Sequence, residues 1–268
     1  MQNILLLGTA LVDHLIYSEE PLKKDSCNKL PNHLSSGGSI RNIAYNLGVL
    51  GVPATFLSVW GQDEQAEKLK KQLHDVNIPT FGPSIALDTP IFTAISTPDL
   101  NLLISGLTPD FLLTASFPFN YEDYDFLVTN SDDEVLLKTI IHSNPKIKLI
   151  SISNLPAAVF REQVAGIIIN RHELARQVGK TDYREIAGKY FGWLIVSEDS
   201  AGLSYYNGTA SGHLANRINQ KDGYAIGCGD VLAAGIIAKL YNRESFFAAV
   251  NFGHNLAEDL YLKPDSTL

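Results

Sequence analysis

Short apolar runs alternate with helix-like stretches along most of this chain, and this alternation limits the possible fold more than any other feature. The apolar runs that we interpret as strands are 4–7, 54–59, 126–128, 149–152, 167–169 and 194–196. The stretches with helical spacing are 40–50, 65–76, 134–141, 172–178 and 183–190. Continuous apolar runs are typical of strands buried on both faces. Repeated strand-then-helix units therefore predict an α/β fold, in which a mainly parallel sheet is covered by helices on both faces and binds ligands beyond the carboxyl ends of its strands.

Three stretches do not follow this alternation. Residues 11–17 are expected to form a second strand after a bend. Residues 18–36 are polar and contain Pro21 and Pro31, which predicts either an irregular segment or an exposed hairpin. The apolar stretches 91–95 and 100–104 lie on either side of Thr97-Pro98-Asp99, and this pattern predicts a hairpin.

The composition fits a globular protein and excludes several classes of partner. The 268 residues carry a net charge of −8 and no cluster of lysine or arginine, so we expect no nucleic acid and no membrane among the partners. No apolar stretch reaches the length of a membrane span, and the N-terminal apolar run is too short for a signal peptide. Cys27 and Cys228 are far apart and form no disulfide framework, so a cytoplasmic location is expected.

The sequence Gly227-Cys228-Gly229-Asp230 stands directly before an apolar stretch that predicts a helix. Small residues allow backbone N–H groups to gather, and a helix start adds free N–H groups and the positive end of the helix dipole, so such a place binds an anion. We expect a phosphoryl group there, with Gly227, Cys228 and Gly229 facing its oxygens. Asp230 would take the proton from the attacking hydroxyl. Taken alone, such a short motif is more often an ordinary helix start, because Asp is a good N-cap.

Three further motifs give this one its context. Gly37-Gly38 opens the stretch GGSIRNIAYNLGVLG, Trp60-Gly61-Gln62-Asp63 follows the next strand, and Asn170-Arg171-His172-Glu173 stands at a strand-to-helix junction. Together with residues 227–230, these motifs resemble, in order and spacing, the signatures of the ribokinase/pfkB carbohydrate kinase family. The resemblance spans nearly the whole chain.

This resemblance implies a fold and a reaction. The fold is a single ribokinase-like domain over residues 1–268, a doubly wound sheet with a small β lid from about residues 14–34 and 88–105. The reaction is transfer of the γ-phosphoryl group of ATP, with Mg²⁺, to a hydroxyl of a small-molecule sugar or nucleoside. Related enzymes often pair through their lid sheets, so a homodimer through the lid is an expectation that the resemblance adds.

The resemblance also assigns residues to the acceptor. Asp13 corresponds to an aspartate that holds sugar hydroxyls, and Gly37 and Gly38 allow a substrate to approach the backbone. The amide of Asn42 both donates and accepts hydrogen bonds. Arg41, within the string Arg-Asn-Ile-Ala-x-Asn-Leu, resembles the pseudouridine kinase branch, which implies a nucleoside acceptor. The alternatives are a solvated turn at Asp13 and a capped, packed helix after the two glycines.

The nucleotide side is assigned in the same way. Asn170 and Glu173 correspond to the family's Asn-x-x-Glu, which organises Mg²⁺, largely through water, and the phosphates of ATP. Ser197 and Gly202 lie where the family forms its adenine-nucleotide loop, and Asn255 is expected to line the adenine pocket. The alternatives are a favourable first-turn acid for Glu173 and an ordinary surface amide for Asn255.

Two positions depart from the family pattern. Asp199 stands where the nucleotide loop has glycine, so its charge leaves the nucleotide preference open. Tyr224-Ala225 replace an Asp-Thr that helps to form a monovalent-cation site, so weak or absent potassium activation is expected. These departures motivate an alternative function, a ligand-binding pfkB-like protein with weak or no kinase activity. A dinucleotide-binding oxidoreductase is a weaker alternative, because Gly8-Thr9-Ala10 follows the first strand in place of Gly-x-Gly-x-x-Gly.

Overall fold

Two sheets of unequal size make up the β structure. A computed structural model describes residues 3–98, 101–179, 182–190, 192–208, 210–218, 226–262 and 267–268. Within these residues, nine strands form one sheet, called here the large sheet, and four strands form a second one, called the small sheet.

The large sheet is mainly parallel, as the alternation of apolar runs and helices predicts. Its strand order is β13-β12-β11-β10-β9-β8-β1-β4-β5, and every neighbouring pair from β11 to β5 is parallel. The pairs β11–β12 and β12–β13 are antiparallel. The strands are β1 (Ile4–Leu7), β4 (Ala54–Leu57), β5 (Thr80–Phe81), β8 (Phe126–Thr129), β9 (Lys148–Ile152), β10 (Val164–Asn170), β11 (Trp193–Ser197), β12 (Leu203–Asn207) and β13 (Ala210–Leu214).

Helices cover both faces of the large sheet, which confirms the doubly wound α/β arrangement. They are α1 (Ser39–Val49), α2 (Glu64–Asp75), α3 (Glu134–Ser143), α4 (Arg171–Val178), α5 (Tyr183–Ala187), α6 (Cys228–Tyr241) and α7 (Phe246–Tyr261). Side chains of β1 alternate between two hydrophobic clusters: Ile4 and Leu6 share one with α1, α2, α6 and α7, whereas Leu5 and Leu7 share the other with α3, α4 and α5. Because both faces of β1 are buried, its sequence is apolar throughout.

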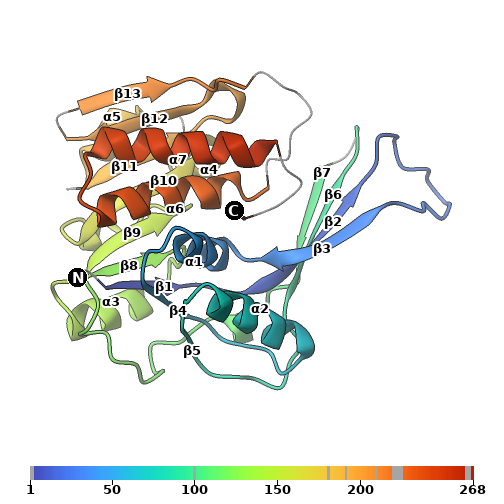
Figure 1. The fold of residues 1–268 in the computed structure, drawn as a ribbon, viewed down its shortest axis with the longest axis horizontal. Helices are drawn as coiled ribbons and strands as arrows, with labels where there is room; N and C mark the ends of the chain where they lie inside the picture. Colours follow the sequence, from blue (N-terminus) through green and yellow to red (C-terminus); the bar gives the residue numbers. More distant parts are fainter. Residues whose placement is uncertain are drawn as a thin grey trace.

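Helices α1, α6 and α7 lie side by side on one face of the large sheet (Figure 1). The middle of α6, residues 231–238, is completely buried between its neighbours. Glycine allows α7 to approach closely, because a Cβ added to Gly235 would lie only 2.7 Å from the Cα of Gly253. This packing holds the first turn of α6 beside α1. Within the described part of the chain, no helix has both the length and the apolar character that crossing a membrane requires.

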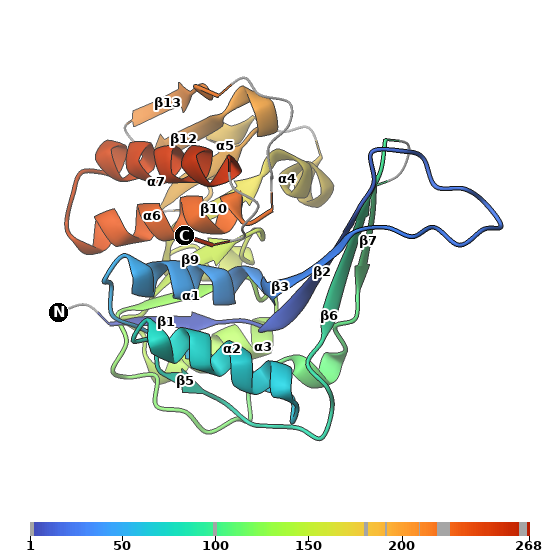
Figure 2. The ribbon, with the colours of Figure 1, turned by 45° about the vertical axis from the view of Figure 1, so that its right-hand side comes forward.

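The small sheet projects from the body of the molecule (Figures 1 and 2). Its order is β3-β2-β6-β7, with β2 (Leu11–Tyr17), β3 (Asn32–Gly37), β6 (Ile91–Ser96) and β7 (Asn101–Ser105). Both structures expected for residues 18–36 are present: residues 18–31 are irregular, and the following strand β3 forms a hairpin by pairing antiparallel with β2. The hairpin expected from the apolar stretches 91–95 and 100–104 is also confirmed, as the antiparallel pair β6–β7. Asp99, of the Thr97-Pro98-Asp99 segment between the two stretches, lies outside the described residues.

Candidate active site

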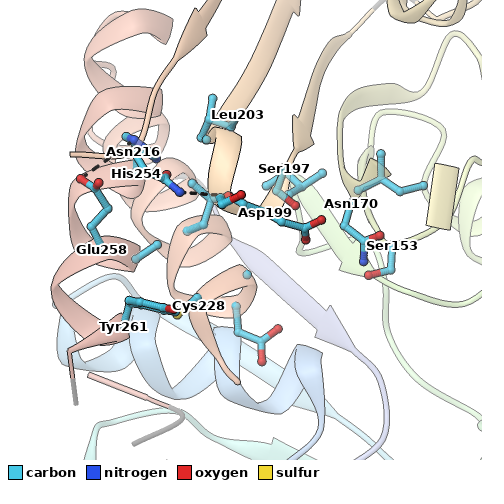
Figure 3. Close-up of a pocket in the computed structure, with 18 of the residues that line it drawn as sticks. Ser153, Asn170, Ser197, Asp199, Leu203, Asn216, Cys228, His254, Glu258 and Tyr261 are labelled. Atoms are coloured by element: carbon cyan, nitrogen blue, oxygen red, sulfur yellow. Dashed lines mark hydrogen bonds and ion pairs between the residues drawn. The ribbon is translucent and has the colours of Figure 1, made fainter. Parts of the chain in front are cut away.

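A cavity of about 450 Å³ lies where the carboxyl ends of three parallel strands meet α6 and α7. Strands β9, β10 and β11 end at Ile152, Asn170 and Ser197, and all three residues line it. Ligands of open α/β sheets bind at such an edge. Figure 3 shows that side chains from β10, the β11 loop and α7 surround the same space.

Asp230 lies in the first turn of α6 and lines this cavity. The helix begins after Gly227, whose φ of 82° is a left-handed conformation that glycine adopts without strain. The Asp230 carboxylate accepts hydrogen bonds from the Ser39 hydroxyl at 2.5 Å and from the Asn42 amide at 3.0 Å. Both donors belong to the first turn of α1, so the packing of α1 against α6 joins two motifs that are far apart in the sequence.

The environment of Asp230 changes its acidity. Burial raises its pKa to about 6, against 3.8 for an ordinary aspartate. The hydrogen bonds from Ser39 and Asn42 lower the pKa, and the negative charges of Asp13 and Glu173 raise it. The carboxyl is therefore ionised at neutral pH but holds a proton more readily than an exposed aspartate does. A partly buried carboxylate of this strength is suited to accept a proton from a hydroxyl.

Asn170 and Glu173 form a capping box at the start of α4. The Asn170 side-chain oxygen accepts from the N–H groups of His172 at 2.9 Å and Glu173 at 2.8 Å, and the Glu173 carboxylate accepts from the N–H of Asn170 at 3.2 Å. Both residues also line the cavity. The two interpretations of Glu173 are therefore compatible, because the acid stabilises the helix start and still faces the cavity.

The residues near Glu173 fit a Mg²⁺ ion that is bound mainly through water and phosphate. Within the described ranges, no three His, Cys, Asp or Glu side chains gather to hold a metal. Mg²⁺ does not need such a cluster, because it keeps several waters and takes one or two carboxylates together with phosphate oxygens. The capping box engages one carboxylate oxygen of Glu173, and the other remains to accept from a metal-bound water.

Asp199 begins the short 3₁₀ turn η3 (Asp199–Ala201) and lines the cavity at the expected nucleotide loop. Its φ of 52° is left-handed, a conformation that aspartate tolerates better than most residues. Its carboxylate lies 3.0 Å from the guanidinium of Arg171 and 2.9 Å from the ring of His172. The guanidinium offsets the negative charge that the sequence analysis expected to oppose a phosphate.

A polar cluster that no sequence motif indicated lies at another side of the cavity. Glu258 is 6% exposed, and its carboxylate accepts from the guanidinium of Arg217 at 2.6 Å and from the N–H groups of Arg217 and Ile218. Burial raises the pKa of Glu258, but the bonds from Arg217 outweigh burial and bring it below its ordinary value. His254 and Asn216 lie on the same side as Glu258, away from Asn170 (Figure 3). The signal in the sequence was the four-residue spacing of His254 and Glu258, which puts both side chains on one face of the mostly apolar helix α7.

Asp13 and the two glycines of the first motif come together where β2, β3 and α1 meet. Asp13 is 8% exposed, and burial raises its pKa to about 6 although the charge of Arg41 lowers it. A Cβ added to Gly37 would lie 2.4 Å from the carboxyl carbon of Asp13. Gly38 has a φ of 95°, and a Cβ there would lie 2.2 Å from the carbonyl oxygen of Thr9. Gly38 requires glycine, because it combines a positive φ with a backbone contact, whereas a side chain at Gly37 would displace the Asp13 carboxylate.

Arg41 is enclosed by protein groups. It is 1% exposed, and its guanidinium donates to the side-chain oxygens of Gln72 at 2.6 Å and Asn42 at 3.2 Å. The guanidinium carbon lies 5.1 Å from the centre of the Tyr45 ring. The contacts of Arg41 are therefore with the chain itself, whereas the resemblance placed it among the residues that bind the substrate.

Most of the residues that the sequence analysis selected for the nucleotide gather at the cavity. Its lining includes Asn170, Glu173, Ser197, Gly202, Cys228, Gly229 and Asp230. Asn255 is not among the described residues that line it, because the α7 face turned to the cavity carries His254, Ala257, Glu258 and Tyr261. A neighbouring helix position points about 100° away from such a face. Tyr224 and Ala225 lie outside the described residues.

Comparisons with known proteins agree with this architecture. The model of the family described as "pfkB family carbohydrate kinase" matches residues 1–264. Among curated proteins, none matches the chain. Among solved structures, a ribokinase from Thermotoga maritima is 16% identical, with a TM-score of 0.81 over 99% of this chain and 95% of that chain.

Two further structures extend the likeness. A ribokinase from Cryptococcus neoformans in complex with ADP is 15% identical, with a TM-score of 0.73 over 99% of this chain and 96% of that chain. A nucleoside kinase from Methanocaldococcus jannaschii is 17% identical, with a TM-score of 0.77 over 99% of this chain and 93% of that chain. At these identities the likeness concerns the fold. The match to the family model over nearly the whole chain goes further: this protein belongs to the pfkB family of carbohydrate kinases.

Proposed function

We propose that this protein transfers the γ-phosphoryl group of ATP to a hydroxyl of a sugar or nucleoside, with Asp230 as the general base. The observation that carries the proposal is the position of the Asp230 carboxylate. It lies in the first turn of a helix, lines a cavity at the carboxyl edge of the sheet, and accepts hydrogen bonds from two polar side chains of α1.

The chemistry of the site supports the assignment of Asp230. Phosphoryl transfer needs positioning and charge stabilisation more than covalent help. The helix start at Gly227, Cys228 and Gly229 brings backbone N–H groups and the positive end of the helix dipole beside Asp230. In this proposal these N–H groups would face the oxygens on which phosphoryl charge develops. A pKa of about 6 keeps Asp230 ionised at neutral pH and ready to accept the hydroxyl proton as the new P–O bond forms.

The nucleotide would occupy the cavity, with its phosphates near Asn170 and Glu173 and its base toward α7. The ADP complex among the similar structures supports a nucleotide site in this fold. Mg²⁺ bound with the nucleotide would offset phosphate charge, and Glu173 is the residue that would hold it through water. Ser197 and Gly202 would border the nucleotide, since both line the same cavity.

The acceptor would bind on the Asp13 side of Asp230. A carboxylate accepts two hydrogen bonds from neighbouring hydroxyls, and Asn42 adds an amide next to the base. Gly37 and Gly38 keep side chains out of this region. The motif around Arg41 favours a nucleoside acceptor, whereas the similar structures include both ribokinases and a nucleoside kinase and so leave the acceptor class to the experiment below.

We also propose that the small sheet is the lid and that two copies pair through it. Strand alternation puts Asp13, Phe92 and Leu103 on one face and Leu34, Ile91 and Ile104 on the other. Each of the last three is about half exposed. The first face would cover the acceptor, and a second copy would cover the other. Sedimentation should give a dimer for the wild-type protein and a monomer for Leu34→Lys; a monomeric wild type contradicts the pairing.

A coupled assay of ADP release over a panel of acceptors tests the function. The panel contains pseudouridine, other nucleosides, ribose and fructose phosphates, each with ATP and Mg²⁺. We expect turnover with at least one acceptor and its loss in Asp230→Asn. Tight binding of a panel member without turnover would instead support a ligand-binding protein, the alternative that Asp199 and Tyr224 motivate.

A further inference from the structure

A continuous row of polar side chains runs from the small sheet to the carboxylate of Asp230. The Ser36 hydroxyl, on β3, and the guanidinium of Arg41 both donate to the side-chain oxygen of Gln72, at 2.5 Å and 2.6 Å. Arg41 also donates to the side-chain oxygen of Asn42 at 3.2 Å, and the amide nitrogen of Asn42 donates to Asp230 at 3.0 Å. Three helices, α2, α1 and α6, thus meet through these bonds.

The row gives the Asn42 amide a defined orientation. An asparagine side chain presents an acceptor oxygen on one side and a donor NH₂ group on the other. An ionised Asp230 only accepts, and the guanidinium of Arg41 only donates. If the amide turned over, its oxygen would face the carboxylate and its NH₂ group would face the guanidinium, so both contacts would be lost.

Arg41 is itself held in place. Its side chain is 1% exposed, Gln72 accepts from one terminal nitrogen, and the ring of Tyr45 lies beside it. Burial lowers the pKa of Arg41 to about 10, so the group stays charged at neutral pH. Within the described residues its Nε has no hydrogen-bond partner. A buried cation with an unpaired donor is costly for stability. The negative charge of Asp13 compensates part of this cost, and the guanidinium also orients the Asn42 amide.

We propose that Arg41 is a positioning residue of the phosphoryl transfer: held by Gln72, it fixes the Asn42 amide in the orientation that donates to Asp230. Arg41 acts through Asn42 and contacts neither the nucleotide nor the reacting hydroxyl. This inference rests on the proposed function, in which Asp230 is the base.

The charged groups around Asp230 set the direction of the expected effect. Asp13 from β2 and Glu173 from α4 both raise its pKa, while Asn42 and Ser39 from α1 lower it. On its own helix, burial raises the pKa of the Cys228 thiol to about 11, so that group stays neutral. Glu258 and His254 of α7 line the same cavity on another side. Loss of the oriented donor at Asn42 should therefore raise the pKa of Asp230.

The experiment compares Arg41→Met, Arg41→Lys, Gln72→Met and Asn42→Ala with the wild type and with Lys71→Met, an exposed control on α2. The readouts are kcat against pH with the best acceptor, KM for ATP, and the carboxyl ¹³C titration of Asp230. For Arg41→Met we expect about a tenfold loss of kcat, since the base is misoriented. The pKa of Asp230 should rise both in the acid limb of the kcat–pH profile and in the ¹³C titration. KM for ATP should stay within twofold of the wild-type value.

Two comparisons separate positioning from charge and from folding. Lysine keeps the charge but cannot donate from a planar fork to both neighbours, so Arg41→Lys should behave like Arg41→Met. In an Asn42→Ala background, Arg41→Met should change kcat less than twofold, because the path through Asn42 is already absent. If Arg41→Met does not fold, Gln72→Met, on a half-buried helix position, should show the same upward shift in weaker form.

Several results would overturn the inference. The first is an unchanged pKa of Asp230 in Arg41→Met or, where that variant does not fold, in Gln72→Met. The second is that the kcat losses of Arg41→Met and Asn42→Ala add in the double variant. The third is that Arg41→Lys has the kcat and the Asp230 pKa of the wild type. The ¹³C titration needs no catalytic activity, so it distinguishes failure of this inference from failure of the proposed function, which would appear as a wild type without turnover on any acceptor.

Discussion

Replacing Asp230 with asparagine should disable the reaction and stabilise the fold, and the structure gives the size of the second effect. Burial raises the pKa of Asp230 from 3.8 to about 6. Ionising this carboxyl therefore costs the folded protein about 3 kcal/mol above pH 6, which asparagine does not incur. Both neighbours keep a partner, because the new amide oxygen accepts from Asn42 and the Ser39 hydroxyl accepts from the new NH₂ group.

The gain in stability has a defined dependence on pH. Because the pKa is raised in the folded state, the carboxyl is protonated in both the folded and unfolded states below pH 3.8, and the cost is absent there. The cost grows between pH 3.8 and 6 and is complete above that range. The free energy of unfolding of Asp230→Asn should therefore exceed that of the wild type by about 3 kcal/mol at pH 7.5 and by about half as much at pH 5.

Urea unfolding at the two pH values measures this difference, with the fluorescence of Trp60 and Trp193 as the signal. In parallel, kcat should fall by about 10²–10⁴-fold, the usual contribution of a positioned base, while the Kd for ATP stays unchanged. A variant no more stable than the wild type at pH 7.5, or a gain that does not vary with pH, would refute the burial argument. Unchanged turnover would remove Asp230 from the reaction.

Three other substitutions test the surroundings of Asp230. Gly229→Ala adds a Cβ that meets nothing within 4 Å, so the urea midpoint of unfolding should be unchanged or slightly higher. The kcat should fall about tenfold or more, because the methyl group occupies space for the phosphoryl group, and full turnover would show that this space is unused. Gly37→Ala brings a Cβ to 2.4 Å from the Asp13 carboxyl carbon. Calorimetric titration should therefore show acceptor binding weakened about tenfold and ATP binding unchanged, whereas equal weakening of both ligands would argue against a local effect. Asp199→Asn removes an exposed negative charge beside the proposed phosphate site and releases the Arg171 guanidinium from its ion pair. KM for ATP should therefore fall about two- to fivefold at low salt and return toward the wild-type value at high salt, and a higher KM would contradict this reasoning.

Much of the fold follows from local rules that the sequence displays directly. The parallel strands next to β1 are buried on both sides, and burial on both sides leaves an unbroken apolar run in the sequence. Where the boundaries differ, tertiary contacts explain the difference. Strand β10 begins at Val164, earlier than its apolar run indicates, because Gly166 packs directly against the ring of Trp193, and a glycine in a sequence looks like a break.

The candidate site was predictable where it depends on short motifs and hidden where it depends on helix packing. Glycines next to Asp230 indicate an anion site once the three other motifs of the sequence are considered with them. The bonds from Ser39 and Asn42 to Asp230 exist only because α1 packs against α6, and the bond from Arg41 to Gln72 only because α2 packs beside α1. Neither contact has a signature within one segment, which explains why Arg41 was predicted to bind the substrate.

The account is tested most directly by a crystal structure with bound ADP and the acceptor that the panel identifies. The distance to measure joins the reacting hydroxyl oxygen to the nearest carboxylate oxygen of Asp230. We predict about 3 Å, within hydrogen-bond reach, with the hydroxyl between Asp230 and the β-phosphate. An acceptor bound elsewhere, or a hydroxyl beyond the reach of Asp230 and of a single bridging water, would contradict the central claim.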